Sequence, residues 1–404
     1  MNVIFLLNST YPCYTGGREN WLYHVCEALC HRHRVAVISE QPTQDSERLK
    51  GRVGEISSNI TMVHAPNLRN FPATAWLMHS YGNILNQEVV VRSMWRRLKR
   101  ILREFHGEPV FVISMDTVFT GQLGLRAKKA FPNVIFINSV RGPHAEIESR
   151  QFPLLKWYFY ARERQTLSGA DRIWSNGADT RDMLAKEGFS SVVMRNGVDA
   201  GRAHNQVPVP PQYVPANTDL NLITIGTLLD IKGYPELIRA VSLLKERYQI
   251  RLGVTALGKG DPAGYLTLSK ELGVEDQICF AGHQSQTVEY AARFDLAACL
   301  SGGSGLSMAC LESMLSGTTV IAWDSAVYQQ MISHRESGYL VTPWDAEALA
   351  GGIAWLWQHP EERRQMGKAA QEKAMKFDWR QIAQHMEKEW EELLHENVSA
   401  GSGS

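Results

Sequence analysis

Residues 300–317 read LSGGSGLSMACLESMLSG, and this stretch decides how the whole chain is interpreted. They follow the apolar run 294–299 (FDLAAC), which predicts a strand. A glycine-rich turn then leads into a segment whose apolar residues have helical spacing. The predicted helix is apolar or small nearly all round, so we expect it to be buried, yet it carries one charge, Glu312. A buried carboxylate needs a hydrogen-bonding partner, and the turn leaves N–H groups where an anion can sit. The stretch predicts a pocket for a phosphorylated, hydroxyl-rich ligand, although such turns alone are common in α/β proteins.

The composition of the chain excludes several classes of protein. Its 404 residues are too many for one ordinary core, so two domains are expected. Lys+Arg and Asp+Glu both total 42, so no charge excess points to nucleic acid, and none is expected as a partner. No apolar run is long enough to span a bilayer, and residues 1–8 (MNVIFLLN) predict a first strand rather than a signal peptide. Six scattered cysteines without a CxxC pair argue against zinc and favour reduced, buried thiols in a cytoplasmic protein.

Short apolar runs alternate with helical patterns along the chain, which predicts parallel sheets covered by helices. Strands are expected at residues 3–7, 35–39, 110–114, 134–138 and 172–175, and then at 222–225, 251–256, 278–281, 296–300 and 319–322. Between the two sets, residues 207–215 (VPVPPQYVP) hold four prolines and predict a linker. The fold class expected is therefore α/β, with two doubly wound Rossmann-like domains that face each other across a cleft.

The expected domain boundaries follow from this break. We predict an N-terminal domain over residues 1–205, a linker over 206–217 and a C-terminal domain over 218–376. A C-terminal helix over 377–396 is expected to pack back on the N-terminal domain, and 397–404 to form a flexible tail.

Three turns in the second half could contact a ligand. In GTLLDIKGY (226–234), Lys232 could place a point charge for phosphate at the mouth of the cleft, although a solvated surface lysine would look the same. The turn LGKGDP (257–262) is only weakly specific. In FAGH (280–283), backbone groups could read a base edge, whereas His283 itself is as readily an ordinary surface residue.

In this order, NGVD (196–199), these three turns and the helix with Glu312 resemble the retaining glycosyltransferases of family 4, which have the GT-B fold. The resemblance covers nearly the whole chain and is strongest over residues 196–345. It implies a hexosyltransferase-like enzyme that moves a sugar from a nucleotide diphosphate donor to a hydroxyl acceptor with retention of configuration. The implied donor is a UDP-sugar in preference to a GDP-sugar, bound mainly on the second domain. The implied acceptor is a saccharide or lipid-linked saccharide, in polysaccharide or glycolipid synthesis.

The resemblance also implies roles for individual residues. Lys232 matches the lysine that holds the donor diphosphate, and Glu312 matches the carboxylate that accepts hydrogen bonds from the ribose. Such charge and N–H groups are what a departing diphosphate needs. The implied donor-binding residues are Gly16, Gly17, Thr227, Lys232, His283, Ser304, Gly305, Leu306, Ser307 and Glu312, and the implied catalytic residues are Lys232, Arg141 and His144.

The chain departs from the family pattern at several of these positions. Ser304 stands where the family has a glutamate for the donor sugar, and Thr227 stands where it has an arginine beside the lysine. Gln330 replaces a further glutamate, and the family histidine falls on Arg141, with His144 three residues later. Arg141 could restore the charge lost at Thr227. These departures leave open an alternative function, that of a catalytically weak or inactive relative that binds a nucleotide sugar. A third alternative, an epimerase of the same fold, would need acid–base groups in the cleft, and the sequence offers few candidates.

Two further expectations concern metal and membrane. No Asp-x-Asp and no carboxylate cluster with metal-ligand spacing occurs, so we expect no metal, no cofactor and activity in excess chelator. Residues 89–106 hold six cations beside an apolar stripe at helical spacing. Such a helix can lie on an anionic membrane, where a lipid-linked acceptor would be found, or pack on the sheet with a solvated basic face. The expected location is the cytoplasm, with a peripheral position on the cytoplasmic membrane face as one alternative.

Overall fold

The computed structural model of the chain describes residues 1–11, 17–42, 55–66, 82–205, 207–303 and 306–401. The chain forms two compact units. The first comprises Met1–Arg195 together with Trp379–Ser404, and the second comprises Asn196–Asp378. Each unit holds one sheet whose paired strands are all parallel, so each has the doubly wound α/β architecture that the alternation of strands and helices predicted.

The first sheet has the order β3-β2-β1-β4-β5-β6-β7. Its strands are β1 (Asn2–Thr10), β2 (Arg34–Glu40), β3 (Ile60–Ala65), β4 (Val110–Ser114), β5 (Val134–Val140), β6 (Arg172–Ser175) and β7 (Val192–Val193). Every residue of β4 and β5 is buried, because helices cover both faces of a parallel sheet. The chain order reverses between β1 and β4, and at such a switch point the loops leave a space for ligands.

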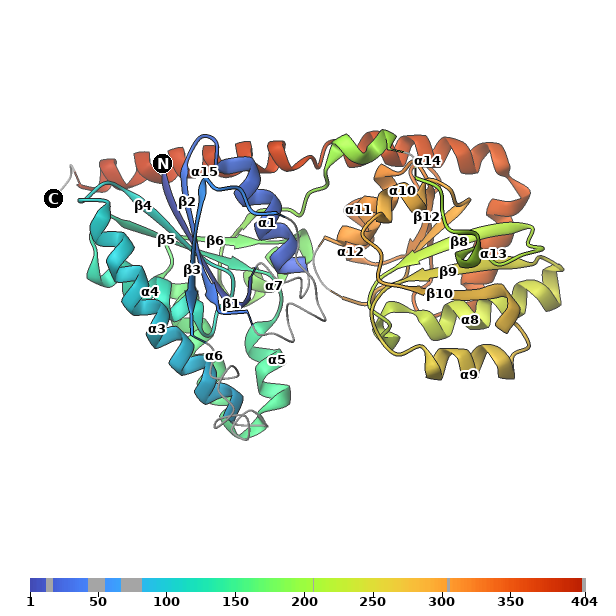
Figure 1. Cartoon of the computed structure of the whole chain (residues 1–404), viewed down its shortest axis with the longest axis horizontal. Helices are drawn as coiled ribbons and strands as arrows, with labels where there is room; N and C mark the ends of the chain where they lie inside the picture. The colour runs from blue at the N-terminus through green and yellow to red at the C-terminus, as the bar shows by residue number, and fades with distance from the viewer. Residues whose placement is uncertain (12–16, 43–54, 67–81, 206, 304–305, 402–404) are drawn as a thin grey trace. The chain divides into compact units, whose positions relative to one another are not determined.

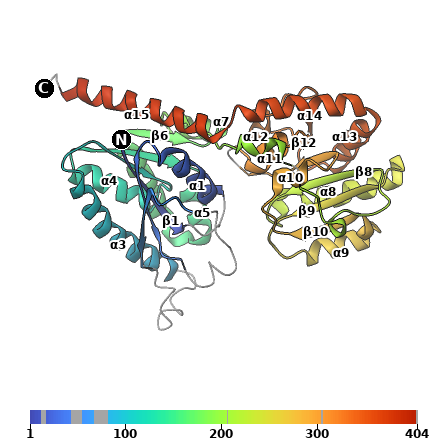
Figure 2. The ribbon, with the colours of Figure 1, turned by 45° about the horizontal axis from the view of Figure 1, so that its top comes forward.

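Helices cover the first sheet on both sides (Figures 1 and 2). On one side lie α1 (Gly17–Leu29) and α15 (Trp379–Gly401), and on the other lie α3 (Gly82–Glu104) and α4 (Thr120–Ala130). The remaining helices of this unit are α5 (His144–Gln151), η3 (Pro153–Leu155), α6 (Lys156–Gly169) and α7 (Ala178–Lys186).

The second sheet has the order β10-β9-β8-β11-β12-β13, with its switch point between β8 and β11. Its strands are β8 (Leu220–Ile225), β9 (Leu252–Leu257), β10 (Ile278–Gly282), β11 (Leu296–Cys299), β12 (Thr319–Trp323) and β13 (Tyr339–Val341). In Figure 1, α8 (Tyr234–Leu243) and α9 (Ala263–Glu271) lie on one side of this sheet, and α11 (Met308–Leu315) and α14 (Pro360–Met375) on the other. The other elements are η4 (Ala200–His204), η5 (Pro211–Tyr213), η6 (Asp230–Lys232), η7 (Leu244–Tyr248), η8 (Glu275–Gln277), α10 (Thr287–Ala291), α12 (Ala326–Gln329) and α13 (Ala346–Gln358).

The proline-rich segment is not the linker between the units, and the expected boundaries at residues 205 and 217 need correction. Tyr213 packs against the core of the second unit, and its carbonyl accepts a hydrogen bond from the Thr255 hydroxyl at 2.6 Å. Further upstream, Val198 is buried in the same core. The chain passes between the units at 195/196 and again at 378/379. Prolines prevent regular hydrogen bonding, but they do not prevent a segment from packing on a domain.

The C-terminal helix belongs to the first unit. In α15, Trp390 stacks on Phe111 of β4 with ring centroids 5.3 Å apart, and Glu387 pairs with His33 at 2.6 Å. Trp379 stacks on His24 of α1. The helix continues to Gly401, so residues 397–401 are helical rather than the flexible tail expected from the sequence.

The apolar stripe of residues 89–106 is part of the core. Val91, Trp95, Leu98 and Leu102 of α3 are buried in the first unit, and Ile101 packs against them. The stripe therefore packs on the sheet, as the second interpretation of this segment expected, and cannot itself enter a membrane. Among the helices that the structure describes, none is both long and apolar enough to cross a bilayer. The described cysteines are free thiols.

Candidate active site

The second unit places Lys232 at its switch point. The residue ends η6, in the loop after β8, and its Nζ donates to the hydroxyl of Ser301, in the loop after β11, at 3.1 Å. Gly233 follows with a φ of 73°, and a Cβ there would lie 2.6 Å from the Cβ of Leu300, so only glycine fits. Burial lowers the pKa of Lys232. A partly buried cation whose partner is a neutral hydroxyl can still form a charged contact with an anionic ligand.

The glycine-rich turn after β11 is held by its neighbours. The amide of Gly302 donates to the carbonyl of Ile231 at 2.8 Å, and the amide of Ser301 donates to the hydroxyl of Tyr328 at 2.9 Å. Ser307 caps α11 by accepting from the amide of Cys310, so the helix begins at Met308. Leu306 is buried, and its carbonyl accepts from the side chain of Asn196 at 2.5 Å. Ser304 and Gly305, two of the expected donor-binding residues, lie outside the described residues.

Glu312 lies on α11 and has the partners that a buried carboxylate needs. Burial raises its pKa, while the hydroxyl of Thr287 and the guanidinium of Arg202 oppose that rise. Arg202 is fixed by a bidentate ion pair with Glu289, with contacts of 3.0 and 2.5 Å, and by a bond to the carbonyl of Ser285. The sequence analysis missed Arg202, Thr287 and Glu289, because the arginine lies 110 residues from Glu312 along the chain.

Backbone hydrogen bonds from glycine amides connect the carboxyl ends of β8, β9 and β10 in this unit. The amide of Gly226 donates to Leu257 and the amide of Gly258 donates to Gly282, both at 2.9 Å. A Cβ on Gly258 would lie only 1.7 Å from the carbonyl oxygen of Gly226. This close backbone packing brings the loops after β8, β9 and β10 together. His283 follows β10, and burial together with the charge of Lys259 lowers its pKa.

Two residues that replace family charges have ordinary surroundings. Thr227 is exposed just after β8. Gln330 follows α12 and donates from its Nε2 to the carbonyl of Ala326 at 2.9 Å. Neither brings a charge to the edge of the second sheet.

Arg141 and His144 lie at the carboxyl end of β5 in the first unit. The guanidinium of Arg141 stacks on the ring of Trp21, 3.8 Å from its centroid, and donates to the hydroxyl of Ser139 at 3.2 Å. Burial lowers the pKa of Arg141 to about 9. His144 begins α5, and its Nδ1 has no hydrogen-bond partner among the residues that the structure describes. Burial, assisted by the charge of Arg18, lowers the pKa of His144 to about 4, so its imidazole is neutral at pH 7.

Further charged groups surround His144, and the sequence analysis missed them. Asp116 follows β4 and accepts the backbone N–H groups of residues 118–120, which caps the start of α4. Glu148 lies one turn after His144 on α5, and burial raises its pKa, with a smaller rise from Asp116. Arg18 lies in the first turn of α1 and bonds the side chain of Asn8. These groups lie in the segments that follow β1, β4 and β5, the neighbouring strands at the switch point.

Of the two glycines expected to bind the donor in this unit, the structure describes only Gly17. Gly17 begins α1, and a Cβ there would meet nothing within 4 Å. Gly16 lies outside the described residues. Within the described ranges, no group of three or more His, Cys, Asp or Glu side chains is arranged to hold a metal ion.

Comparison with known proteins identifies the fold and the family of the chain. "Glycosyltransferase Family 4" matches residues 15–202, and "Glycosyl transferases group 1" matches residues 210–373. Over nearly its full length the structure resembles sucrose-phosphate synthase from Thermosynechococcus elongatus (TM-score 0.75, 17% identity, 98% of this chain and 100% of that one). It also resembles Anabaena HepE in complex with UDP (TM-score 0.72, 16% identity, 97% and 100%). The fold is therefore GT-B, the fold of a large class of glycosyltransferases.

The chain belongs to glycosyltransferase family 4, a family of transferase enzymes. A curated relative, the putative glycosyltransferase EpsD of Bacillus subtilis, is 31% identical over 156 residues. That match covers 38% of this chain and 41% of the relative. The chain thus spans less than half the length of that relative.

Proposed function

We propose that the chain transfers a sugar from a nucleotide diphosphate donor to a hydroxyl acceptor, with retention of configuration. The observation that carries this proposal is Lys232, whose ammonium lies at the β8/β11 switch point against the neutral hydroxyl of Ser301. When the bond from the sugar to the diphosphate breaks, negative charge grows on the leaving phosphate. A fixed cation stabilises that charge without reorganisation at the moment of reaction.

A UDP-sugar is the proposed donor. Structures of Anabaena HepE hold UDP and UDP-glucose, and this chain shares the fold of that protein. Glu312 is proposed to accept hydrogen bonds from the ribose: burial raises its pKa, while Thr287 and Arg202 oppose that rise in favour of the ionised, accepting form. The amides of residues 306–308 are proposed to face the sugar and phosphate. No metal is proposed, since Lys232 and N–H groups would meet the phosphate charge.

The first unit is proposed to bind the acceptor, a saccharide or lipid-linked saccharide in polysaccharide or glycolipid synthesis. His144 is neutral and can donate or accept a hydrogen bond with a sugar hydroxyl, and Arg141 supplies a buried positive charge. The cations on the outer face of α3 would suit an anionic membrane surface, and a peripheral position there would bring the enzyme to a lipid-linked acceptor.

Release of nucleoside diphosphate from UDP- and GDP-sugars tests this function. We expect slow release from a UDP-sugar alone, faster release with a saccharide acceptor, and unchanged rates in excess EDTA. The Lys232→Ala variant is the control for contaminating activity and should release far less nucleoside diphosphate than the unmodified chain. Turnover of GDP-sugars only would overturn the proposed donor, and a strict metal requirement would overturn metal independence.

The alternative is a protein that binds a nucleotide sugar without turnover. The observation that favours it is the exposed Thr227, which brings no second cation to the diphosphate position. Tight binding of a UDP-sugar, measured by calorimetry, without release of UDP under any acceptor would establish this alternative.

A further inference from the structure

Helix α5, which begins with His144, has no side-chain cap of its own. The residue before it is Pro143, which has neither a side-chain oxygen nor a backbone N–H. The amide of His144 donates to the carbonyl of Gly142, and the amide of Ile147 donates to that of Pro143, both at 3.0 Å. Between them lies the amide of Ala145, a fully buried residue. A buried amide without an acceptor is costly, so this one needs a partner from outside the helix.

That partner is Glu163 on α6. Its Oε2 accepts from the amide of Ala145 at 3.4 Å and from the hydroxyl of Thr117, which is fully buried between β4 and α4. Burial raises the pKa of Glu163, and the bonds from Thr117 and Ala145 oppose that rise. One carboxylate oxygen therefore joins two segments at the carboxyl edge of the first sheet, the loop after β4 and the first turn of α5.

The segment that carries Thr117 is itself held by hydrogen bonds. The carboxylate of Asp116, the preceding residue, accepts the backbone N–H groups of residues 118–120. The side chain of Asn138 on β5 donates to the carbonyl of Asp116 at 3.0 Å and to the hydroxyl of Ser114 at 2.6 Å. The hydroxyl of Thr117 is thus a fixed donor, and Glu163 connects α5 to a segment that is already in place.

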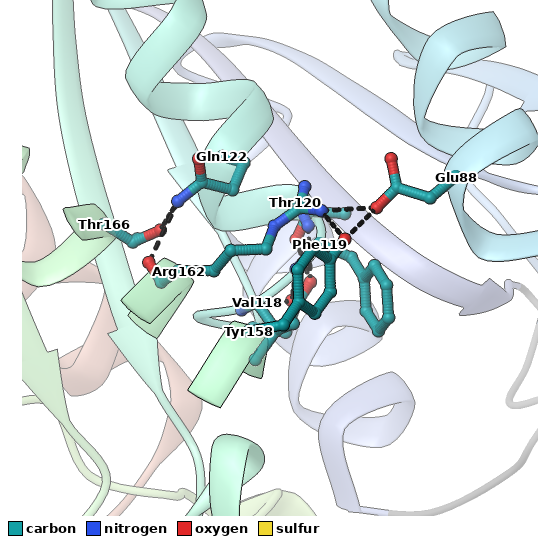
Figure 3. Close-up of polar contacts among 9 residues, drawn as sticks. Glu88, Val118, Phe119, Thr120, Gln122, Tyr158, Arg162 and Thr166 are labelled. Atoms are coloured by element: carbon teal, nitrogen blue, oxygen red, sulfur yellow. Dashed lines mark hydrogen bonds and ion pairs between the residues drawn. The ribbon is translucent and has the colours of Figure 1, made fainter. Parts of the chain in front are cut away.

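Helix α6, which carries Glu163, is held by two other helices (Figure 3). Arg162 donates to the carboxylate of Glu88 on α3. The side chain of Gln122 on α4 donates to the hydroxyl of Thr166 at 2.9 Å. Arg162 and Thr166 lie one turn apart on one face of α6, whereas Glu163 projects from the helix about 100° further round. The contacts with α3 and α4 therefore leave Glu163 available to α5.

We propose that Glu163 is a positioning residue, which fixes the start of α5 and with it His144 against the loop after β4. The expected effect on turnover rests on the proposed function, in which His144 contacts the acceptor. The Nδ1 of His144 has no hydrogen-bond partner in the described ranges, so no bond at that atom orients the ring. A carboxylate suits this place, because its charge also stabilises a helix N-terminus. A group that is held in advance loses less entropy when it orients a substrate.

Nuclear magnetic resonance of the full chain, with carbon-13 in the histidine rings, tests the proposal without substrate. The signal of His144 is identified by its loss in His144→Asn. In the unmodified chain it should not titrate between about pH 5.5 and 7.5, because burial lowers its pKa to about 4. Glu163→Leu removes the acceptor and should loosen the start of α5. His144 is then less buried, and its signal should titrate in this range.

A second pair of variants keeps the test decisive where Glu163→Leu does not fold. Thr117→Val removes the hydroxyl that fixes Glu163 and should also make the signal of His144 titrate. Thr117→Ser keeps a hydroxyl and should restore the behaviour of the unmodified chain. In the same way Glu163→Gln keeps an oxygen acceptor and should change the signal less than Glu163→Leu does.

Glu88→Leu is the matched control. It removes a carboxylate that holds α6 to α3 through Arg162, the neighbour of Glu163, but it leaves the contact with α5 intact. The signal of His144 should therefore stay as in the unmodified chain. The proposal is overturned if His144 does not titrate in Glu163→Leu or Thr117→Val, or if Glu88→Leu changes its signal as much.

Release of UDP from UDP-glucose, with glucose as the acceptor probe, gives a second readout. The acceleration by glucose should fall at least about tenfold in Glu163→Leu and Thr117→Val and should persist in Glu88→Leu. An equal fall in Glu88→Leu would contradict a positioning role. A chain that releases no UDP would contradict the proposed function alone, and the histidine signals would still decide the role of Glu163.

Discussion

The carboxyl edges of the two sheets have the same construction but carry different chemistry. In each unit, polar groups follow the two strands at the switch point, β1 and β4 or β8 and β11. In the second unit, Lys232, whose pKa burial lowers, donates to the neutral hydroxyl of Ser301 at that point. In the first unit, burial shifts the pKa of Arg141, His144 and Glu148 away from their ordinary values.

This difference teaches what each edge can do. A cation with a neutral partner gains most from an incoming anion, so the second edge suits a diphosphate. Half-buried groups form stronger and better oriented hydrogen bonds than exposed ones, so we expect the first edge to suit neutral hydroxyls that must be held in place. The following predictions test this division, from the largest expected effect to the smallest.

Replacing Lys232 should produce the largest loss. Lys232→Ala removes the cation that meets the charge of the leaving diphosphate, and turnover should fall about 100- to 1000-fold. The rate of UDP release measures this, with Lys270→Ala on α9 as a control that should keep full activity. Full activity of Lys232→Ala would show that the second edge does not stabilise a diphosphate.

A methyl group at Gly258 should disrupt the second edge. Its Cβ would lie 1.7 Å from the carbonyl oxygen of Gly226, so Gly258→Ala should cost about 3 kcal/mol of unfolding free energy. In the first unit, Gly17→Ala meets nothing within 4 Å and should change stability by less than about 0.5 kcal/mol. Urea denaturation of both variants measures the difference. Equal stabilities would contradict the close packing of the strand ends.

Arg141 should affect both turnover and stability. Arg141→Ala removes a half-buried cation. If that charge orients the substrate, turnover should fall about 30-fold, which corresponds to about 2 kcal/mol of activation free energy. It also removes the stacking on Trp21, so the variant should lose about 1–2 kcal/mol of stability. Arg141→Lys keeps the charge and should recover part of the turnover; turnover of Arg141→Ala at the normal rate would exclude a role for the charge.

The smallest predicted effect is the pH dependence from His144. Its pKa is about 4 in the folded chain and near 6.5 when unfolded, so the unfolded state binds more protons between these values. Stability should therefore fall as pH drops below 6.5, by about 1 kcal/mol between pH 6.5 and 5.5. Urea midpoints at the two pH values measure this. His144→Asn should lose this dependence, while His31→Asn, an exposed position in the same unit, should keep it.

The central strands and the edge strand β10 could be predicted well from the sequence, but the other edge strands could not. The predictions for residues 110–114 and 172–175 match β4 and β6 residue for residue, because each strand is a short run that is centred on apolar residues and ends at a serine. The strands β3, β7 and β13 were missed. They lie at or near the edges of their sheets, and several of their residues are only half buried, so their hydrophobic pattern is weak.

The site divides in a similar way. The position of Lys232 in the turn after β8 was predictable, because a turn between a strand and a helix is local in sequence, whereas its contact with Ser301 was not. The pairing of Arg202 with Glu289 and the group around His144 were not, since their members come from distant segments. The exposure of Trp157 and Leu154 was not predictable either, because residues of these types are usually buried in a core.

The sequence by itself determined the α/β class, the two sheets, the family and the lysine turn, because strand and helix periodicity and local turns depend on neighbouring residues. Only the tertiary structure decided where the chain crosses between units, which charges surround Glu312 and His144, and which apolar side chains remain exposed. These features depend on contacts between residues far apart in the chain. Only after those contacts have formed does burial shift a pKa, and only then is it decided which side chains stay exposed.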